Sequence, residues 1–464
     1  MTTFTRGAVE MLRLCYISYG VLTPTRAHNL QIVHTINALV RCGASVDFIN
    51  PELGESAQAR RLRNGMLDND PPTSTLRNIP GSGCFVIRTP DFYRRYIRNR
   101  QAGRYWFLFL DRSLFAIKAL RRFCELPGHC VVTRDVVVCF WFLVLRRWIG
   151  VPVIYELHTL EQVMFGGRKQ SRPSSPRPED LDPSRISLRP SAFAGDQVDS
   201  SLPGKAYKWF LTRLENWTIR RADTVMALTR TLAKRLEREL GIQPPVVVSS
   251  GHTIDSAPAG DKLTLRRSLR LPPNRKIAIY SGLSFHGKGV DLLFDVAGHL
   301  PPDCSILLLG GEPEQMPTLK SLWSRRKLGD RMILAPSVVQ SRVVDYLCAA
   351  DVGLLCYPAT PYLARFSSPL KLFEYLACGL PVVATDLPAT REVVIHGWNG
   401  VLVDSQEPAY LASAIAGVMH DRAALERMGQ QALADSTKYH HRQRARRIIE
   451  IIGNCRRNSD SACT

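Results

Sequence analysis

The sequence contains no Cys-x-x-Cys pair, although twelve cysteines are spread along its 464 residues. Zinc ribbons and thioredoxin-like redox motifs both need such a pair, so neither is expected. Most of the cysteines stand in apolar runs and are expected to be small, buried hydrophobic residues in a reducing environment.

Long hydrophobic runs are also missing. The longest, residues 136–145, has ten residues, which is about half the length that spans a bilayer. The first fourteen residues lack the apolar core of a secretory signal. Together these absences predict a cytoplasmic protein, with contact to a membrane only at its surface.

Acidic side chains are scarce relative to basic ones. The chain has 41 Asp and Glu against 61 Lys and Arg, a formal charge of +20. This balance favours an anionic partner, which could be nucleic acid, a membrane surface or a phosphorylated substrate. The rest of the composition, 45% hydrophobic and 22% charged, is that of an ordinary globular protein.

The length predicts two lobes, because single hydrophobic cores rarely grow beyond about 300 residues. Apolar runs alternate with helical periodicities along both halves, which is typical of doubly wound parallel sheets. The predicted strands of the first half are 12–19, 45–49, 130–133, 151–157, 223–229 and 245–250. Those of the second half are 276–283, 304–311, 332–337, 351–358 and 400–404.

We therefore predict a Rossmann-like N-terminal domain over residues 1–255 and a second over 256–435. Residues 166–204 are rich in Pro, Ser and charge, so they are predicted to be a disordered insertion in the first domain. Residues 436–464 are predicted to form a basic amphipathic helix that returns to the N-terminal domain, followed by a short tail.

A glycine-rich turn follows the predicted strand at 276–283. Gly282-x4-Gly287-Lys288 nearly matches a P-loop, but Gly289 stands where a Ser or Thr would hold Mg²⁺, so an ATPase is not expected. A flexible turn that carries a lysine suits an anionic ligand. The alternative is a surface lysine in a tight turn.

The stretch SSPLKLFEYLACGLPVVATD, residues 367–386, predicts a short capped helix followed by a strand. Ser368 fits the N-cap and Pro369 the first helical position. The free amides of the first turn favour an anion, and Glu374 could accept hydrogen bonds from ribose or sugar hydroxyls beside it. The alternative is an ion pair of Glu374 with Lys371 on a solvated face.

Residues 366–394 closely resemble the nucleotide-binding signature of the retaining glycosyltransferases of family 4, which have the GT-B fold. That fold is α/β, with two Rossmann-like doubly wound domains facing across a cleft. Further segments also resemble the family: PTRAHNLQIVHTINALVRCGASV (24–46), GVPVIYELH (150–158), RRADTVMALTRTLAKRL (220–236), YSGLSFHGKGVDLL (280–293) and VVDYLCAADVGLLCYP (343–358).

The resemblance implies a role for individual residues. Glu374 would hold the ribose hydroxyls of a nucleotide-sugar donor, Lys288 its diphosphate, and His158 would lie near the reacting face of the sugar. The remaining donor-binding positions would be Gly20 near the diphosphate, the backbone of Ser368, Pro369 and Leu370 near the donor sugar and phosphate, and the loop from Pro336 to Val338 against the base.

Two positions depart from the family pattern. Phe366 stands where the first of two glutamates is expected, and Leu283 where an arginine often accompanies the lysine. Either the donor sugar is held differently or catalysis is weakened. Arg134 ends another predicted strand, and it either faces the cleft or is an exposed structural residue.

The expected function is transfer of a sugar from a UDP- or GDP-linked donor to a hydroxyl of a glycan or lipid-linked acceptor, with retention. No metal or other cofactor is expected, because no Asp-x-Asp pair stands at a predicted strand end. The alternatives are a non-catalytic relative that binds sugar nucleotides or glycans, and a basic polyanion-binding protein.

Residues 92–110 interleave arginines with aromatic side chains. Such a segment can lie on an anionic membrane, bind single-stranded nucleic acid or form a solvated basic helix. For a glycosyltransferase the membrane is the expected partner, and no nucleic acid is expected.

Overall fold

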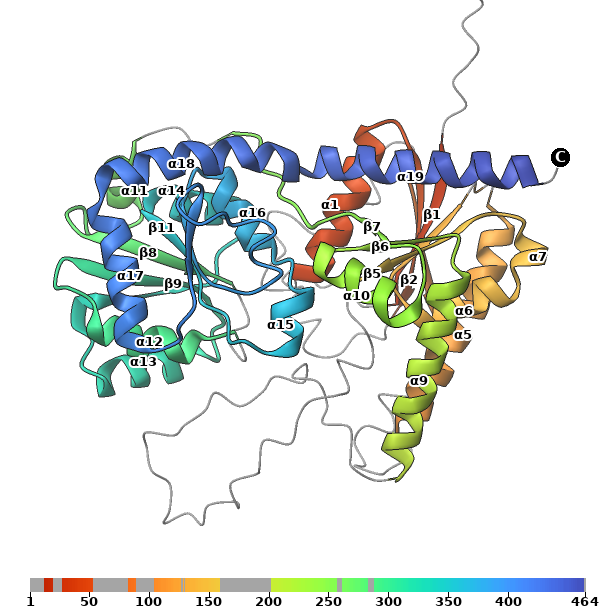
Figure 1. The fold of residues 1–464 in the computed structure, drawn as a ribbon, viewed down its shortest axis with the longest axis horizontal. Coiled ribbons are helices and arrows are strands. Elements are labelled where there is room, and N and C mark those ends of the chain that lie inside the picture. The colour runs from red at the N-terminus through yellow and green to blue at the C-terminus, as the bar shows by residue number, and fades with distance from the viewer. Residues whose placement is uncertain are drawn as a thin grey trace, which may run out of the picture.

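The computed structural model describes residues 12–19, 27–52, 82–88, 104–126, 128, 130–158, 202–256, 261–282 and 288–462. The chain forms two α/β lobes, each built around a parallel sheet, and its C-terminal helix lies along the N-terminal lobe (Figure 1). The predicted residues Gly20 and Leu283 lie outside the described residues, as do 92–103 and 166–201.

The N-terminal lobe holds a seven-stranded sheet in the order β3-β2-β1-β4-β5-β6-β7. All neighbouring strands are parallel. The strands are β1 Arg13–Ile17, β2 Ser45–Glu52, β3 Ser82–Arg88, β4 Val131–Thr133, β5 Val153–Leu157, β6 Thr224–Ala227 and β7 Val246–Val247. The order reverses between β1 and β4, which is where ligands bind in open α/β sheets.

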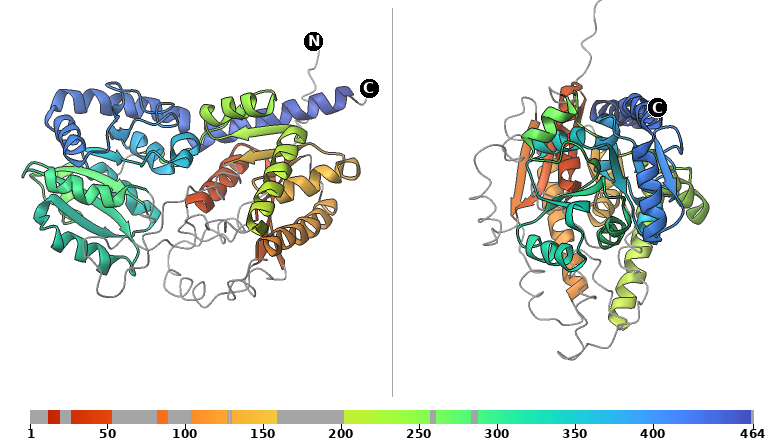
Figure 2. Two further views of the ribbon diagram at one scale, coloured as in Figure 1. Left: turned by 60° about the horizontal axis from the view of Figure 1, so that its bottom comes forward. Right: turned by 90° about the vertical axis from the view of Figure 1, so that its left-hand side faces the viewer.

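Helices cover both faces of this sheet (Figures 1 and 2). They are α1 Ala27–Arg41, α5 Arg104–Cys124, α6 Val136–Val144, α7 Arg146–Ile149, α9 Leu202–Arg221 and α10 Arg230–Leu240. Helix α9 begins at Leu202, so the prediction that the insertion extends to 204 is wrong by three residues.

The longest apolar run of the sequence is helix α6. Its N-cap Asp135 accepts hydrogen bonds from the amides of Val137 and Val138, which starts the helix. Most of its side chains are buried in the core, which explains why the helix is apolar on all sides. None of the helices that the structure describes combines the length and the apolarity that a bilayer crossing requires.

The C-terminal lobe repeats the pattern with a six-stranded parallel sheet in the order β10-β9-β8-β11-β12-β13. Its strands are β8 Lys276–Ser281, β9 Cys304–Gly311, β10 Met332–Pro336, β11 Val352–Leu355, β12 Val382–Thr385 and β13 Gly400–Val403. The order reverses between β8 and β11. The two doubly wound sheets confirm the predicted GT-B architecture.

The helices of this lobe come in sequence between and after its strands. They are α11 Lys262–Ser268, α12 Val290–His299, α13 Met316–Arg325, α14 Gln340–Ala349, α15 Pro361–Phe366, α16 Leu370–Ala377, α17 Pro408–His420 and α18 Arg422–Ser436. Two 3₁₀ turns, η3 Gly329–Arg331 and η4 Thr437–Tyr439, complete the lobe.

Helix α19, His441–Ala462, leaves the C-terminal lobe and runs along the N-terminal lobe (Figures 1 and 2). Its apolar face, including Ile448 and Ile452, belongs to the same core cluster as Ile36 of α1 and Leu14 of β1. The last helix of the chain therefore contributes to the hydrophobic core of the first lobe.

A second joint between the lobes lies where α10 meets α15. The Glu392 carboxylate accepts hydrogen bonds from the amides of Arg230 and Thr231, at 2.6 and 2.7 Å, and so caps α10 from the other lobe. The Thr229 hydroxyl donates to the Arg365 carbonyl at 2.9 Å. These contacts set how the two lobes meet.

Four histidines gather where the chain crosses into α19. The rings of His34 and His441 lie 5.4 Å apart, and those of His252 and His440 lie 5.2 Å apart. Burial lowers the pKa of His34 to about 4. Burial, together with the nearby Arg444 and the other three histidines, lowers the pKa of His441 well below its usual value. Both rings are therefore neutral in the folded protein at pH 7.

We predict that stability falls when the pH is lowered from 7 to 5. A histidine with a folded pKa of about 4 and an unfolded pKa of about 6.5 is protonated first in the unfolded chain as the pH falls. The stability that its neutral form contributes to the folded protein is therefore complete above pH 6.5 and is lost as the pH falls toward 4. For His34 alone the loss at pH 5 is about 2 kcal/mol. Urea unfolding at the two pH values measures it.

The variant His34→Leu should lose less stability between pH 7 and pH 5 than the wild type. The exposed His299 provides a matched control, because His299→Leu should keep the wild-type loss. An equal loss in all three proteins would contradict this prediction.

Candidate functional site

The predicted site residues follow strands at the carboxyl edges of the two sheets. Because all strands of a sheet are parallel, their carboxyl ends share one edge. In the C-terminal lobe, Lys288 follows β8 and helix α16 follows β11, so both stand at the switch point. Pro336 ends β10, and Val338 lies in the loop after it. In the N-terminal lobe, His158 directly follows β5.

Helix α16 begins without a side-chain cap. Its N-cap is Pro369, so the prediction that Ser368 caps the helix and Pro369 is its first residue is wrong. The Ser368 hydroxyl instead accepts a hydrogen bond from the Ser250 amide at 3.2 Å. Gln31 of α1 donates to the Ser250 hydroxyl at 2.8 Å. The serine therefore joins the lobes, and the first-turn amides from Leu370 onward carry no side-chain cap.

Glu374 lies one turn into α16, and Gln340 of α14 holds it. The Gln340 side-chain amide donates to Glu374 Oε1 at 2.7 Å. Burial raises the pKa of Glu374, while Gln340 and Lys371 act to lower it. Gln340 is the first residue of α14 and comes four residues after the end of β10, so this hydrogen bond joins α16 to the helix that follows β10. Sequence reasoning missed Gln340, which has no distinguishing motif.

Of the two alternatives for this helix, the ion pair between Glu374 and Lys371 on a solvated face is wrong. Lys371 is only 9% exposed and its ammonium forms no ion pair with Glu374 in the described structure. The helix is covered on this face by the end of β8, which the spacing of polar residues along the sequence does not reveal.

The structure explains why the P-loop match fails at Gly289. This glycine has φ +78°, and a Cβ there would lie 2.2 Å from the carbonyl oxygen of Cys356, just beyond β11. No Ser or Thr fits, so the turn lacks the Mg²⁺-binding hydroxyl of an ATPase. The neighbouring Lys288 is half-buried, and burial lowers its pKa.

His158 is held by the buried carboxylate of Glu156. Its Nε2 lies 2.9 Å from Glu156 Oε1. Burial, and secondly the charge of Arg134, lower the pKa of His158 to about 4, so the ring is neutral at pH 7. Burial acts to raise the pKa of Glu156, but Arg134 and Arg444 outweigh it and hold that pKa well below its usual value. An ionised carboxylate only accepts hydrogen bonds, so Nε2–H is the donor and Nδ1 carries the lone pair.

Two arginines and a tyrosine complete this cluster. Arg134 donates to Glu156 Oε1 at 2.9 Å, and the Tyr16 hydroxyl donates to Oε2 at 2.6 Å. Arg444 of α19 also donates to Oε1. Arg134 is therefore a buried partner of Glu156, and of the two predicted alternatives the exposed one is wrong.

Phe366 does not lie among the polar groups of the site. It is 1% exposed and belongs to the same apolar cluster as Leu232 and Leu236 of α10, in the other lobe. The guanidinium of Arg235 lies 5.6 Å from its ring centre. The position that the family pattern gives to a carboxylate is therefore part of the apolar contact between the lobes.

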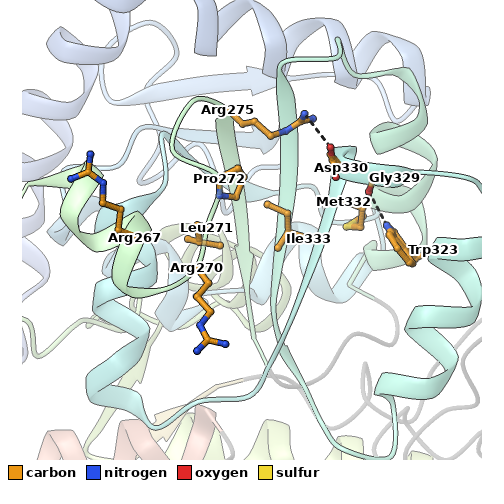
Figure 3. Close-up of a pocket in the computed structure, with 10 residues that line it drawn as sticks. All are labelled: Arg267, Arg270, Leu271, Pro272, Arg275, Trp323, Gly329, Asp330, Met332 and Ile333. Carbon is orange, nitrogen blue, oxygen red and sulfur yellow. Dashed lines mark hydrogen bonds and ion pairs between the residues drawn. The ribbon is translucent and has the colours of Figure 1, made fainter.

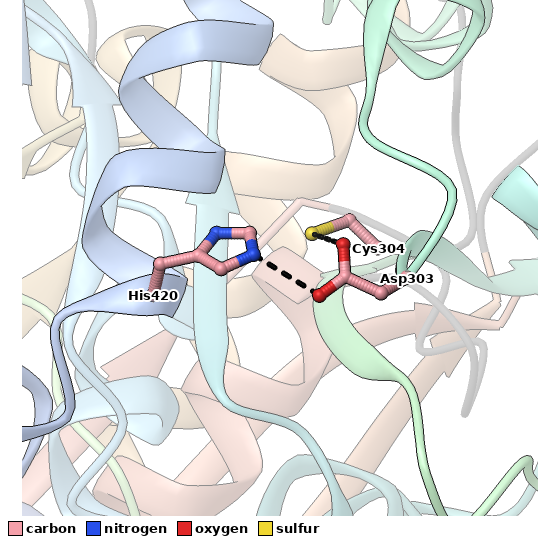
Figure 4. Close-up of side chains that lie close together, drawn as sticks. All are labelled: Asp303, Cys304 and His420. Atoms are coloured by element: carbon pink, nitrogen blue, oxygen red, sulfur yellow. Dashed lines mark hydrogen bonds and ion pairs between the residues drawn. The ribbon is translucent and has the colours of Figure 1, made fainter.

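Two other features lie at the opposite, amino edge of the C-terminal sheet. A pocket of about 620 Å³ lies beside the start of β8 and β10, lined by residues such as Arg275 and Trp323 (Figure 3). Asp303, Cys304 and His420 lie close together (Figure 4), but Asp303 already pairs with Lys276 and His420 at 2.8 and 3.0 Å. Neither feature belongs to the site at the carboxyl edge.

We predict that Arg444→Met destabilises the protein by about 3 kcal/mol, because it leaves part of the charge of a buried carboxylate unpaired. Arg444 also donates to the Val248 and Ser249 carbonyls, both at 2.6 Å, which adds to the loss. The exposed Arg447, three residues further along α19, is a matched control whose change to Met should cost about 0.5 kcal/mol or less. Equal denaturant midpoints for the two variants would contradict the view that Arg444 stabilises the buried carboxylate of Glu156.

Comparison with known proteins covers both lobes. Residues 28–251 match the family model described as glycosyl transferase 4-like domain, and residues 261–435 match glycosyl transferases group 1.

Two curated relatives are D-inositol 3-phosphate glycosyltransferases. The protein from Xylanimonas cellulosilytica is 29% identical over 51% of this chain and 58% of its own length. One from Catenulispora acidiphila is 27% identical over 64% of each chain. This chain therefore spans about three fifths of the length of the relatives that it matches.

Solved structures share the fold. Sucrose-phosphate synthase from Thermosynechococcus elongatus has a TM-score of 0.67 at 18% identity, over 96% of this chain and 98% of its own. Anabaena HepE in complex with UDP-glucose has a TM-score of 0.62 at 17% identity, over 96% of this chain and 100% of its own. With a glycosyltransferase family model on each lobe and the two-sheet architecture, the chain belongs to glycosyltransferase family 4 and has the GT-B fold.

Proposed function

We propose that the protein transfers a sugar from a UDP- or GDP-linked donor to a hydroxyl group of an acceptor, with retention of anomeric configuration. The observation that carries the proposal is the group of polar residues at the switch point between β8 and β11. There the uncapped start of α16, Lys288 and the Gln340-bound Glu374 follow strands of one sheet edge. The family membership of both lobes supports it.

The nucleotide would lie against the C-terminal lobe. The amides of Ser368 and Leu370 and the Lys288 ammonium suit the two phosphates, because both present positive charge to an anion. Glu374 Oε2 would accept hydrogen bonds from the ribose hydroxyls, since Oε1 is already bound by Gln340. The loop from Pro336 to Val338 would contact the base.

The sugar would lie toward the N-terminal lobe and His158. A neutral ring whose Nε2–H is donated to Glu156 presents Nδ1 as an acceptor. Nδ1 would therefore accept a hydrogen bond from a sugar hydroxyl and orient the anomeric carbon. Glu156 and Arg134 act as positioning residues, because they fix the tautomer and the charge of the ring.

Transfer would break the bond between the anomeric carbon and the phosphate oxygen and form a bond to the acceptor oxygen on the same face. The acceptor proton would go to the departing phosphate. Lys288 and the α16 amides would stabilise the charge that develops on the diphosphate. We propose that no metal is needed, so activity should persist in a chelator.

The acceptor would be a hydroxyl of a glycan or a lipid-linked molecule. The named substrate of the curated relatives, D-inositol 3-phosphate, is a further acceptor to test. A phosphorylated acceptor suits a chain with a formal charge of +20.

We predict that UDP or GDP raises the thermal stability of the protein. A ligand at 100 times its Kd should stabilise it by about 2.7 kcal/mol, and a tenfold loss of affinity reduces this to about 1.4 kcal/mol. Glu374→Ala should cause such a loss, because it removes the ribose contact. Glu426→Ala, in an exposed pair on α18, is the matched control and should leave the nucleotide-induced shift unchanged.

Other outcomes would favour the alternatives. Nucleotide binding without release of nucleoside diphosphate, across panels of donors and acceptors, would favour a non-catalytic relative. Nucleic-acid affinity that survives Glu374→Ala, with no nucleotide-induced shift, would favour a polyanion-binding protein. Formation of a product with inverted anomeric configuration, read by NMR, would contradict retention.

We also propose that the N-terminal lobe contacts an anionic membrane surface around residues 92–110. The described part of this segment begins α5, where Trp106 is 40% exposed and packs 5.2 Å from the ring of Phe210 in α9. Trp209, also in α9, is 62% exposed, and the Arg213 guanidinium lies 5.1 Å from the centre of its ring. Tryptophan beside arginine is typical of membrane interfaces.

We predict that the protein co-sediments with vesicles containing phosphatidylglycerol more than with pure phosphatidylcholine. Trp209→Ala should reduce this binding several-fold, because it removes exposed aromatic area at the interface. Tyr410→Ala, 52% exposed on the C-terminal lobe, is the control and should bind as the wild type does. Binding that is independent of both lipid charge and Trp209 would contradict the membrane proposal.

A further inference from the structure

Lys371 is a buried cation without an acceptor. It is the second residue of α16 and is 9% exposed. Among the residues that the structure describes, its Nζ has no hydrogen-bond partner. Nζ instead lies 3.5 Å from the centre of the Tyr280 ring. Aromatic faces attract cations, but they do not replace the hydrogen bonds that an ammonium loses on leaving water.

Two other buried cations, Arg266 and Arg444, are hydrogen-bonded through all of their guanidinium nitrogens. Arg266, 5% exposed, donates to the Ala349 carbonyl at 2.8 Å and to the Asp351 carboxylate at 2.7 Å. Arg444 donates to Glu156 and to backbone carbonyls. Lys371 differs from both. The one carboxylate on the next turn of its helix is Glu374, and that carboxylate accepts its hydrogen bond from Gln340.

The Lys371 ammonium points to the start of the glycine-rich turn. A Cβ on Gly282 would lie 2.7 Å from Lys371 Nζ, so the glycine leaves the space that the ammonium occupies. Gly282 directly follows β8, and Lys288 stands at the far end of the same turn. Burial lowers the pKa of Lys371 well below its usual value, and the charge of Lys288 lowers it further, with Glu374 acting in the opposite direction.

Lys371, at the uncapped start of α16, and Lys288 are thus near enough for their positive charges to interact, with Glu374 as the nearby carboxylate. Like charges in a buried place repel each other and each loses hydration, so this arrangement is unfavourable without an anion. A group with several negative oxygens would supply acceptors to both lysines and to the amides at once.

We propose that Lys371 is a second lysine ligand of the donor diphosphate, acting with Lys288 across the turn that begins at Gly282. The inference rests on the proposed function, because it assigns a residue within the same donor site. The family often has an arginine at the position of Leu283. The positive charge of Lys371 would take the place of that arginine.

The test compares the wild type with Lys371→Met, which keeps the length and apolar body of the side chain. Three quantities are measured: the Tm of the ligand-free protein, the Kd of UDP, GDP and inorganic pyrophosphate, and the binding of uridine and guanosine by ligand-observed NMR. We expect the ligand-free Tm to stay the same or rise, because a buried amine without a hydrogen-bond partner in the described structure is removed. We expect affinity for the diphosphates and pyrophosphate to fall about tenfold or more, with nucleoside binding unchanged.

Lys276→Met is the matched control. Lys276 begins the same strand, β8, at its opposite end and pairs with Asp303 at 2.8 Å, so its loss should leave all affinities unchanged. Unchanged diphosphate affinity in Lys371→Met would overturn the inference. An equal loss of nucleoside binding would also overturn it, because it would show that Lys371 acts through Glu374 and the ribose.

The same measurements separate this inference from the proposed function. If the wild type binds pyrophosphate through Lys371 but no nucleoside diphosphate, the anion site stands and the nucleotide-sugar donor is wrong. If the nucleotides bind and Lys371→Met has no effect, the donor stands and the role of Lys371 is wrong. Wild-type protein that binds neither nucleotide nor pyrophosphate would overturn both.

Discussion

Glu156 is enclosed at the carboxyl end of β5, where one carboxylate accepts hydrogen bonds from side chains of three other segments. Tyr16 reaches it from β1, Arg134 from the end of β4, and Arg444 from α19. His158, two residues away, takes its orientation from the same oxygen. Because the carboxylate is buried, each partner is needed to hold its charge. The orientation of the His158 ring and the attachment of helix α19 through Arg444 therefore both depend on the Glu156 carboxylate.

This arrangement links the N-terminal sheet to the end of the chain. Helix α19 packs its apolar face on α1 and β1 and delivers the Arg444 guanidinium to Glu156. The Ser250 amide and Ser368 hydroxyl, together with Phe366 against the α10 cluster, join the lobes beside the start of α16. The parts that would bind the nucleotide and the parts that would orient the sugar are thus positioned by the same contacts between lobes.

The sequence predicts well where local rules dominate. Buried parallel strands appear as apolar runs, and Gly241 stops helix α10 where the sequence places it. Strand β3 is absent from the predicted strands, although it contains the short apolar run CFVI. Ser368 was predicted as a cap from its type and place, but its hydroxyl serves the other lobe. A side chain with two possible partners is not assigned by local sequence alone.

Residue patterns by themselves determined the two doubly wound lobes, the order of their strands along the chain and the positions at which polar residues follow them. Tertiary structure alone decided which of those residues are buried and what they contact. Lys371, which one of the two alternatives placed on a solvated face, lies against Tyr280, and Gln340, without any motif, holds Glu374. The physical reason is that burial and pairing depend on segments far apart in sequence, which only the packing of the sheet edges brings together.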